Sequence, residues 1–419
     1  MNDTTNTAPA QGQAQSPSPP PLPAGQPAPA QAAAPLQPPS PFPPPLPAGQ
    51  AQASAPAQSQ QAAPPAPPKY ILTHANEYGT QGEFDKDIAE FSSYANLVTG
   101  FPPLDRIQPF YPGLYCLGAI SSLGKTTFAL QLADQAAASG QWVIYFSLEQ
   151  TRFELYSKSM ARGFFLKERT ATAAGNKLSL LPTPSSIDIR RGIPSASYPQ
   201  GLREQIDRYD TMVKQRMRIV HGAFSMTVED IITVTEQVIK DVKQAYNADI
   251  RPLVVVDYLQ IVSPTLVNGR IPDTKTAIDH VVHSLKIMQA QYGLTVLAIS
   301  SLNRMNYLTP VDFESFKETG ALEYTADVIW GLQLAIMRCP EFMHHYDQNT
   351  GKRGGETSLK EKRDMVNHAK AQNPREIDLV CLKNRYGRAS YSVRFDYYPA
   401  NDLYWMPFDP NDPDTAFRY

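Results

Sequence analysis

The sequence predicts an α/β domain whose parallel sheet is covered by helices on both faces. Three observations support this fold class. Short apolar segments alternate along the chain with helical patterns. The apolar segments lack the in-and-out alternation of a half-exposed strand, which is typical of strands buried on both faces. Between one such strand and the helix that follows it, residues 119–126 have the composition of a phosphate-binding loop.

The first elements follow from these patterns in order. Residues 113–119 (GLYCLGA) predict a buried strand, and residues 125–140 predict a helix that Gly140 ends. Residues 142–149 predict a second strand. A helical stretch begins near Arg152. The pattern then breaks, and we interpret residues near 167–186 as an inserted loop.

The second half of the chain continues the alternation. Its elements are, in order, a helix at 227–246, a strand at 252–262, a helix at 274–293 and a strand at 294–300. Thr227 is of a type that caps helix N-termini. Residues 340–376 form a polar, charged interruption. Beyond it, 377–384 and 390–398 predict two late strands, joined as a hairpin through 385–388.

The N-terminal segment has a different composition. Residues 1–68 hold 21 of the 39 prolines, and Asp3 is their only charged residue. Such a segment buries too little apolar surface to offset the entropy of ordering, so we expect a disordered Pro/Ala/Gln-rich tail. The nearly repeated stretches 16–26 and 40–50 are consistent with a plain tail or linker, or with a docking site for a proline-reading module.

The remaining chain divides into two parts. We expect residues 69–97 to be a linker with a helical lead-in, and residues 98–419 to form one domain with insertions near 167–186 and 340–376. The net charge of −2 gives no overall positive field that would indicate a nucleic-acid partner, although a few local cations are enough to bind one. No long apolar run or signal peptide is present, so we expect no membrane association and a cytoplasmic location. Three widely spaced cysteines, Cys116, Cys339 and Cys381, suggest reduced core residues.

The stretch AISSLGKT, residues 119–126, differs from the usual phosphate-loop pattern G-x-x-x-x-G-K-[ST] at its first position, where Ala119 replaces glycine. A helix N-terminus with free N–H groups binds anions. In this pattern Lys125 would reach the β- and γ-phosphates, and the Thr126 hydroxyl would bind Mg²⁺. The predicted nucleotide-binding residues in this stretch and directly after it are Ala119, Ser122, Gly124, Lys125, Thr126 and Thr127.

Two carboxylates follow predicted strands. Asp257 ends an apolar strand, where an unpaired charge is costly and a Mg²⁺ ion would justify it. The other interpretation is an aspartate that caps the next loop. Glu149 ends the strand after the phosphate-loop helix, at the same edge of a parallel sheet, where it can orient and deprotonate an attacking water. A glutamate in a surface loop is the alternative.

A third cluster is cationic. Lys383, Arg385 and Arg388 lie on the predicted hairpin. They are either a solvated turn or a source of an arginine finger, Arg385, that reaches the γ-phosphate of a neighbouring subunit. In the second case the active site is complete only in an oligomer.

These stretches, in this order, resemble the motor domain of the DnaB-type replicative helicases, which has a RecA-like core and a P-loop NTPase site. The resemblance runs from residue 99 to about residue 395 and includes KTTFALQL, FSLE, VVVDYLQI and KETGALEYTADVI. It implies ATP and Mg²⁺ as cofactors, Lys125 and Glu149 as catalytic residues, and Thr126 and Asp257 as metal contacts. Lys383 and Arg385 match the cations that act on a neighbouring subunit's nucleotide. The family's phosphate loop often begins with alanine, as Ala119 does here.

The resemblance also implies the partners. The stretch KETG, residues 317–320, matches a loop that grips single-stranded DNA inside a ring of six identical subunits. The DNA-binding residues implied are Arg304, Lys317, Glu318 and Gly320. A primase or loader partner cannot be named from the sequence.

The chain departs from the family pattern in three respects. Ser301 stands where the family has a glutamine that senses the γ-phosphate, and we expect no counterpart of the family's helical N-terminal domain. The insertions near 167–186 and 340–376 are also unusual for the family. Despite these departures, the resemblance implies an ATP-dependent ring helicase that translocates on single-stranded DNA during replication. The alternatives are an ATP-binding ring scaffold and a RecA-like DNA-binding ATPase, neither of which unwinds.

Overall fold

The computed structural model describes residues 81–93, 97–173, 183–193, 199–222, 225–266, 270–303, 307–316, 320–346 and 353–406. The predicted tail, residues 1–68, lies outside the described residues, as do residues 69–80 and 94–96 of the predicted lead-in.

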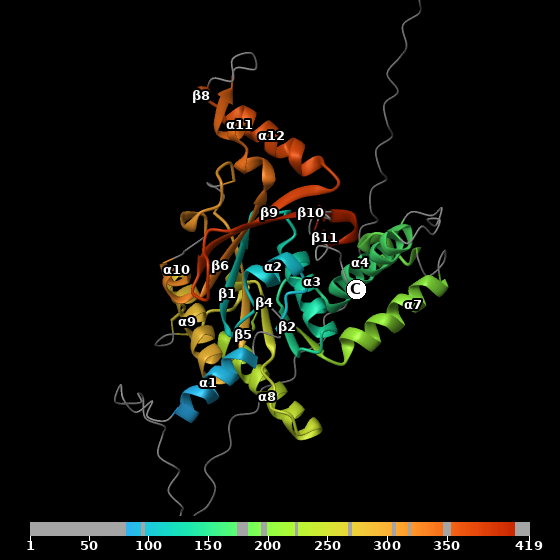
Figure 1. The fold of residues 1–419 in the computed structure, drawn as a ribbon, viewed down its shortest axis with the longest axis vertical. Helices are drawn as coiled ribbons and strands as arrows, with labels where there is room; N and C mark the ends of the chain where they lie inside the picture. Colours follow the sequence, from blue (N-terminus) through green and yellow to red (C-terminus); the bar gives the residue numbers. More distant parts are fainter. Residues whose placement is uncertain are drawn as a thin grey trace, which may run out of the picture. The chain divides into compact units, whose positions relative to one another are not determined.

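The described residues form a sheet of nine strands in the order β11-β10-β9-β6-β1-β5-β4-β2-β3 (Figure 1). The strands are β1 (Gly113–Ala119), β2 (Val143–Ser147), β3 (Met217–His221), β4 (Leu253–Asp257), β5 (Thr295–Ser301), β6 (Val328–Leu334), β9 (Arg375–Asn384), β10 (Ser392–Tyr398) and β11 (Leu403–Trp405). β1 to β6 pair in parallel. β9, β10 and β11 add an antiparallel edge, because the short connection between β9 and β10 can only form a hairpin. The predicted parallel sheet is thus confirmed, with an antiparallel extension.

Helices cover both faces of this sheet. The chain moves one way along the sheet through α3 (Lys125–Ala138) and α4 (Arg152–Ala173), and returns through α8 (Val228–Tyr246) and α9 (Thr274–Tyr292). Right-handed crossovers in opposite directions place their helices on opposite faces. In agreement, α3 contacts α4 and α8 contacts α9. The other α-helices among the described residues are α1 (Gln81–Ser93), α2 (Pro102–Ile107), α5 (Ser186–Arg190), α7 (Pro199–Tyr209), α10 (Gly320–Thr325), α11 (Pro340–Met343) and α12 (Leu359–Ala371).

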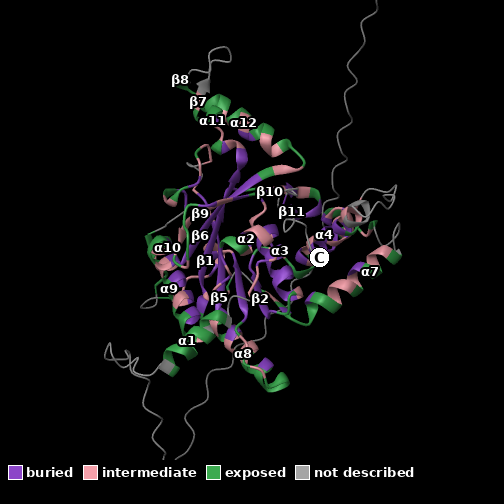
Figure 2. Ribbon diagram, in the orientation of Figure 1, coloured by how far each residue is buried: buried purple, intermediate pink, exposed green. Residues whose placement is uncertain are grey.

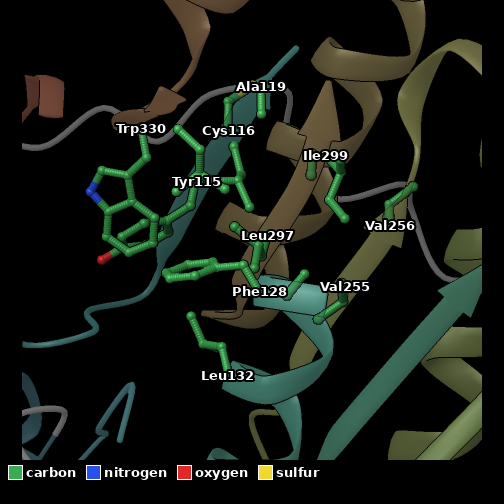
Figure 3. Close-up of a cluster of buried hydrophobic side chains, with 14 of the residues drawn as sticks. Tyr115, Cys116, Ala119, Phe128, Leu132, Val255, Val256, Leu297, Ile299 and Trp330 are labelled. Atoms are coloured by element: carbon green, nitrogen blue, oxygen red, sulfur yellow. The ribbon is translucent and has the colours of Figure 1, made fainter. Parts of the chain in front are cut away.

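The core lies between the sheet and these helices, so the central strands are buried along their length (Figure 2). In Figure 3, Tyr115 and Trp330 of neighbouring strands pack beside Phe128 of α3. The polar atoms of this aromatic group are paired, since Trp330 Nε1 donates to the Tyr391 hydroxyl at 3.0 Å. The buried, hydrogen-bonded indole of Trp330 helps to stabilise β6. The sequence pattern did not predict this strand.

Several expectations need correction. The helix α4 continues to Ala173, so residues 167–173 of the expected loop are helical. Arg169 of α4 lies over the Tyr398 ring at 4.9 Å, which ties this turn of helix to β10. The strand expected at 252–262 ends at Asp257 and is followed by a short 3₁₀ turn. Of the three cysteines, Cys339 is only partly buried.

The polar interruption at 340–376 contains regular structure. It holds α11, a two-stranded hairpin of β7 (His344–Tyr346) and β8 (Arg353–Glu356), and α12, which Ser358 caps. The expected cap Thr227 is confirmed, because its side chain accepts a hydrogen bond from the Asp230 N–H. A bilayer-spanning helix is absent from the part of the chain that the structure describes.

Candidate nucleotide-binding site

A cavity of about 350 Å³ opens at the carboxyl ends of the central parallel strands. In the sheet, β1, β5, β4 and β2 are consecutive neighbours. Each of these strands contributes to the cavity wall where it ends, as expected for an α/β sheet. The structure brings together here most of the residues predicted for the nucleotide site, namely Ser122, Gly124, Lys125, Thr126, Thr127, Glu149 and Asp257. Ser301, at the end of β5, lines the same cavity.

The phosphate loop has the backbone that its function requires. Gly124 has φ 77° and begins α3, and Ser122 also has a positive φ of 70°. A Cβ atom on Gly124 would lie 2.7 Å from the ring of Tyr397. Glycine is therefore needed at this position for two reasons, a left-handed backbone and a lack of space. Tyr397, which the sequence did not flag, closes one side of the cavity.

Lys125 lies in this loop with its ammonium group directed at the backbone. Its Nζ donates to the carbonyl oxygen of Ala119 at 2.9 Å. Burial lowers the pKa of Lys125, against opposing effects of Tyr307, Asp257 and Glu149. Ala119 itself is buried and is absent from the cavity wall, so its role in the loop is to hold Lys125 through its carbonyl group. An anion in the cavity would compete with the Ala119 carbonyl oxygen for this ammonium group and would offset the cost of burying its charge.

Asp257 has the properties of a cation ligand. Its side chain is buried, and Oδ2 accepts a hydrogen bond from Tyr145 at 2.9 Å. Oδ1 has no hydrogen-bond partner among the described residues. Burial raises the pKa of Asp257 to about 6, against the lowering effects of Thr126 and Tyr145, and the nearby Glu149 carboxylate adds to the rise. A buried carboxylate with an unpaired oxygen is costly, and a divalent cation beside it would remove that cost. The residues present therefore fit a Mg²⁺ ion, with Thr126 on the same wall.

Glu149 lies just beyond the end of β2, on the exposed side of the same cavity. Its strand pairs with β4, so that Ser147 lies opposite Asp257. This register holds Glu149 and Asp257 on neighbouring strands at one edge, as the sequence predicted. An exposed carboxylate at the mouth of a phosphate site is accessible to water, which a general base needs.

The sequence did not identify Lys158, a cation on α4 that also lines the cavity. Its Nζ lies 2.5 Å from Asp402 Oδ1. Thr127 donates to the same oxygen at 2.9 Å, so the Thr127 hydroxyl is directed at this aspartate. No spacing rule connects Lys158 to the phosphate loop, because only the packing of α4 against α3 places it there.

Lys383 and Arg385 lie elsewhere. Arg385 NH1 donates to Asp327 Oδ1 at 2.9 Å, and Asp327 also accepts from the N–H of Leu114. Leu114 is near the start of β1, whereas the phosphate loop follows its end. The two cations therefore lie at the amino ends of the parallel strands, whereas the cavity of the same chain lies at their carboxyl ends. One chain alone does not bring them to its nucleotide site.

Of the predicted DNA-binding residues, Arg304, Lys317 and Glu318 lie outside the described residues. Gly320 begins α10 and is exposed. Residues on either side of the undescribed positions are described and paired, since the Asn303 N–H donates to the Ser315 carbonyl oxygen at 2.7 Å. Leu302 likewise forms a bridge with Phe316.

This fold and this cavity are those of a RecA-like P-loop nucleotide-binding domain. Comparison with known proteins narrows the class, because the family described as "DnaB-like helicase C terminal domain" matches residues 96–178 and 190–398. The chain belongs to that family.

Named relatives agree with this assignment. The replicative DNA helicase DnaB of Haemophilus influenzae is 27% identical over 253 residues, which are 57% of this chain and 46% of that protein. The DnaB of Pasteurella multocida is 27% identical over 245 residues, 55% of this chain and 44% of that protein. The chain thus spans about half the length of the curated relatives it matches.

Two solved structures share the fold. The first is described as an ATPase domain, with a TM-score of 0.57 and 18% identity over 79% of this chain and 99% of that one. The second is a DnaB-like replicative helicase described with its interactions with primase, with a TM-score of 0.55 and 18% identity over 78% of this chain and 66% of that one.

Proposed function

We propose that this protein is an ATP-dependent ring helicase that translocates on single-stranded DNA during replication. One observation carries the proposal. Lys125, Asp257 and Glu149 converge on one cavity, whereas Arg385 lies at the opposite edge of the sheet. A ring in which one subunit's Arg385 edge faces its neighbour's cavity would complete the site. Family membership and the DnaB relatives support a ring of six.

The nucleotide would be ATP with Mg²⁺. Lys125 and the N–H groups at the start of α3 would hold the phosphates, and Thr126 and Asp257 would hold the metal. When bound, Mg²⁺ supplies charge stabilisation for phosphoryl transfer. Glu149 would orient the attacking water and take its proton, while Arg385 of a neighbouring subunit would stabilise charge on the transferred group. Lys158 would add a further cation to the phosphates from α4.

A second candidate is a ring that binds ATP and DNA without unwinding. Ser301 favours it, because a glutamine at this position would reach further into the cavity than serine does. The presence of all four predicted catalytic and metal-binding residues, Lys125, Glu149, Asp257 and Arg385, favours a protein that hydrolyses ATP. The two candidates therefore differ in the coupling between ATP hydrolysis and movement along DNA.

The DNA partner can be tested through salt dependence. If Lys317 contacts the phosphate backbone in each subunit, Lys317→Ala should weaken binding to an oligo-dT and flatten the slope of log affinity against log salt. Binding should depend little on base sequence. The measurement is fluorescence anisotropy of labelled oligonucleotides across a salt series. Lys240→Ala, an exposed lysine on α8, is the matched control. Equal affinities and slopes for the wild type and Lys317→Ala would contradict the assignment.

A further inference from the structure

The segment that follows β5 is attached to the phosphate loop at its base. The Leu302 N–H lies 3.4 Å from the carbonyl oxygen of Ala119. A Cβ atom on Gly118 would lie 2.4 Å from the ring of Phe316, so this ring packs directly on the end of β1. Leu302 and Phe316 therefore both contact the end of β1, the strand that leads into the phosphate loop.

A third contact joins the middle of this segment to the phosphate loop itself. The hydroxyl groups of Tyr307 and Ser121 are 3.3 Å apart. Ser121 is an exposed residue of the loop and lines the cavity beside Ser122 and Lys125. A nucleotide phosphate that forms a hydrogen bond with Ser121 would therefore change the hydrogen bond between Ser121 and Tyr307.

The polar segment at 340–376 contacts both Tyr307 and the phosphate loop. Lys370 of α12 places its Nζ 5.9 Å from the centre of the Tyr307 ring. Arg375, which starts β9 after α12, donates from NH1 to the carbonyl oxygen of Ser122 at 2.9 Å. The segment thus holds the phosphate loop directly through Arg375 and indirectly through Tyr307.

We propose that Tyr307 is a positioning residue that couples the phosphate loop to residues 307–316, with Lys370 holding its ring in place. Chain positions 304 and 317, where the DNA contacts are expected, adjoin residues 303 and 316, which each pair with the opposite end of the segment that follows β5. The inference rests on the proposed function, and it supplies a route between nucleotide and DNA that does not pass through the side chain of Ser301. It also gives the 340–376 segment a role at the active site.

The test uses the full chain and the variants Tyr307→Phe, Lys370→Gln and Lys370→Arg. Hydrogen exchange of residues 307–316 is measured with and without ATPγS, and ATPase rates with and without oligo-dT. In the wild type, ATPγS should slow exchange in this segment. Tyr307→Phe should lose that response and reduce stimulation by DNA by about fivefold, which one neutral hydrogen bond is worth. Lys370→Gln should act in the same direction, and Lys370→Arg should retain the wild-type response. Tyr246→Phe, an exposed tyrosine on α8, is the control.

The outcomes separate the two claims. If exchange of 307–316 is the same with and without ATPγS in the wild type, or responds equally in Tyr307→Phe, the coupling role is wrong. If the exchange response is present in the wild type and lost in Tyr307→Phe, but oligo-dT stimulates neither protein, the coupling stands and the DNA partner of the proposed function fails. A chain that binds no ATPγS would remove both.

Discussion

Glu149→Gln should retain ATP binding but hydrolyse ATP at least about 10²-fold more slowly than the wild type, as loss of a water-activating base does. The amide keeps the shape of the side chain but cannot accept a proton from water. Glu149 lies on the exposed side of the cavity, where Lys125 and Asp257 form the wall that would hold the phosphates and the metal. Nucleotide affinity should therefore change little. Steady-state phosphate release and binding of a fluorescent ATP analogue measure the two quantities separately.

Glu154→Gln provides the matched control. This glutamate is on the first turn of α4, where it accepts hydrogen bonds from Thr151 and pairs with Arg190. Its loss should leave kcat within about twofold, because exposed pairs of this kind contribute little. A Glu149→Gln protein that hydrolyses ATP at the wild-type rate would remove Glu149 from the mechanism.

Arg385→Ala should lower kcat by about 10³-fold or more if its guanidinium group acts as an arginine finger. The effect should be complemented across subunits. A mixture of Lys125→Ala and Arg385→Ala subunits forms some interfaces in which both residues are intact, and these should hydrolyse ATP. The measurement is the ATPase rate of mixed rings against the sum of the separate rates. Mixed rings that show no gain over that sum would place Arg385 in its own chain's site or outside catalysis.

A structural effect of Arg385→Ala must be separated from a catalytic one. Arg385 pairs with Asp327, a buried aspartate that also accepts from Lys286 at 2.5 Å. The Lys286 pair remains in the variant, so the melting temperature should fall by only a few degrees. Arg388→Ala, on the same turn, is the control for the hairpin, and its ATPase rate should stay near that of the wild type.

The phosphate site was predictable because its signals are local. A strand, a Gly-Lys-Thr turn and a helix occur together in the chain, and Asp257 and Glu149 each follow a strand directly. Parallel pairing then brings these ends to one edge without any further information. By contrast, β3 was missed because its burial is mixed, with Arg218 exposed on an edge strand, so no apolar run marks it.

Contacts that depend on packing could not be predicted. Lys158 reaches the cavity only because α4 packs on α3. Tyr397 of β10 lies beside Gly124, although the two residues are far apart in the chain. The bond between Tyr307 and Ser121 joins residues 186 positions apart. The contact between Arg169 of α4 and the Tyr398 ring likewise joins residues from distant parts of the chain. Such long-range contacts leave no periodic signal in the sequence.

The helicase proposal is tested most directly by strand displacement from a forked DNA substrate, measured beside ATP hydrolysis in the same reaction. The account predicts that the wild type displaces the strand with ATP and Mg²⁺, and that Glu149→Gln and Arg385→Ala do not. Displacement should also fail when ATPγS replaces ATP. Wild-type protein that forms rings, binds single-stranded DNA and hydrolyses ATP, yet displaces no strand from forks of either polarity, would contradict the account and favour the non-unwinding ring.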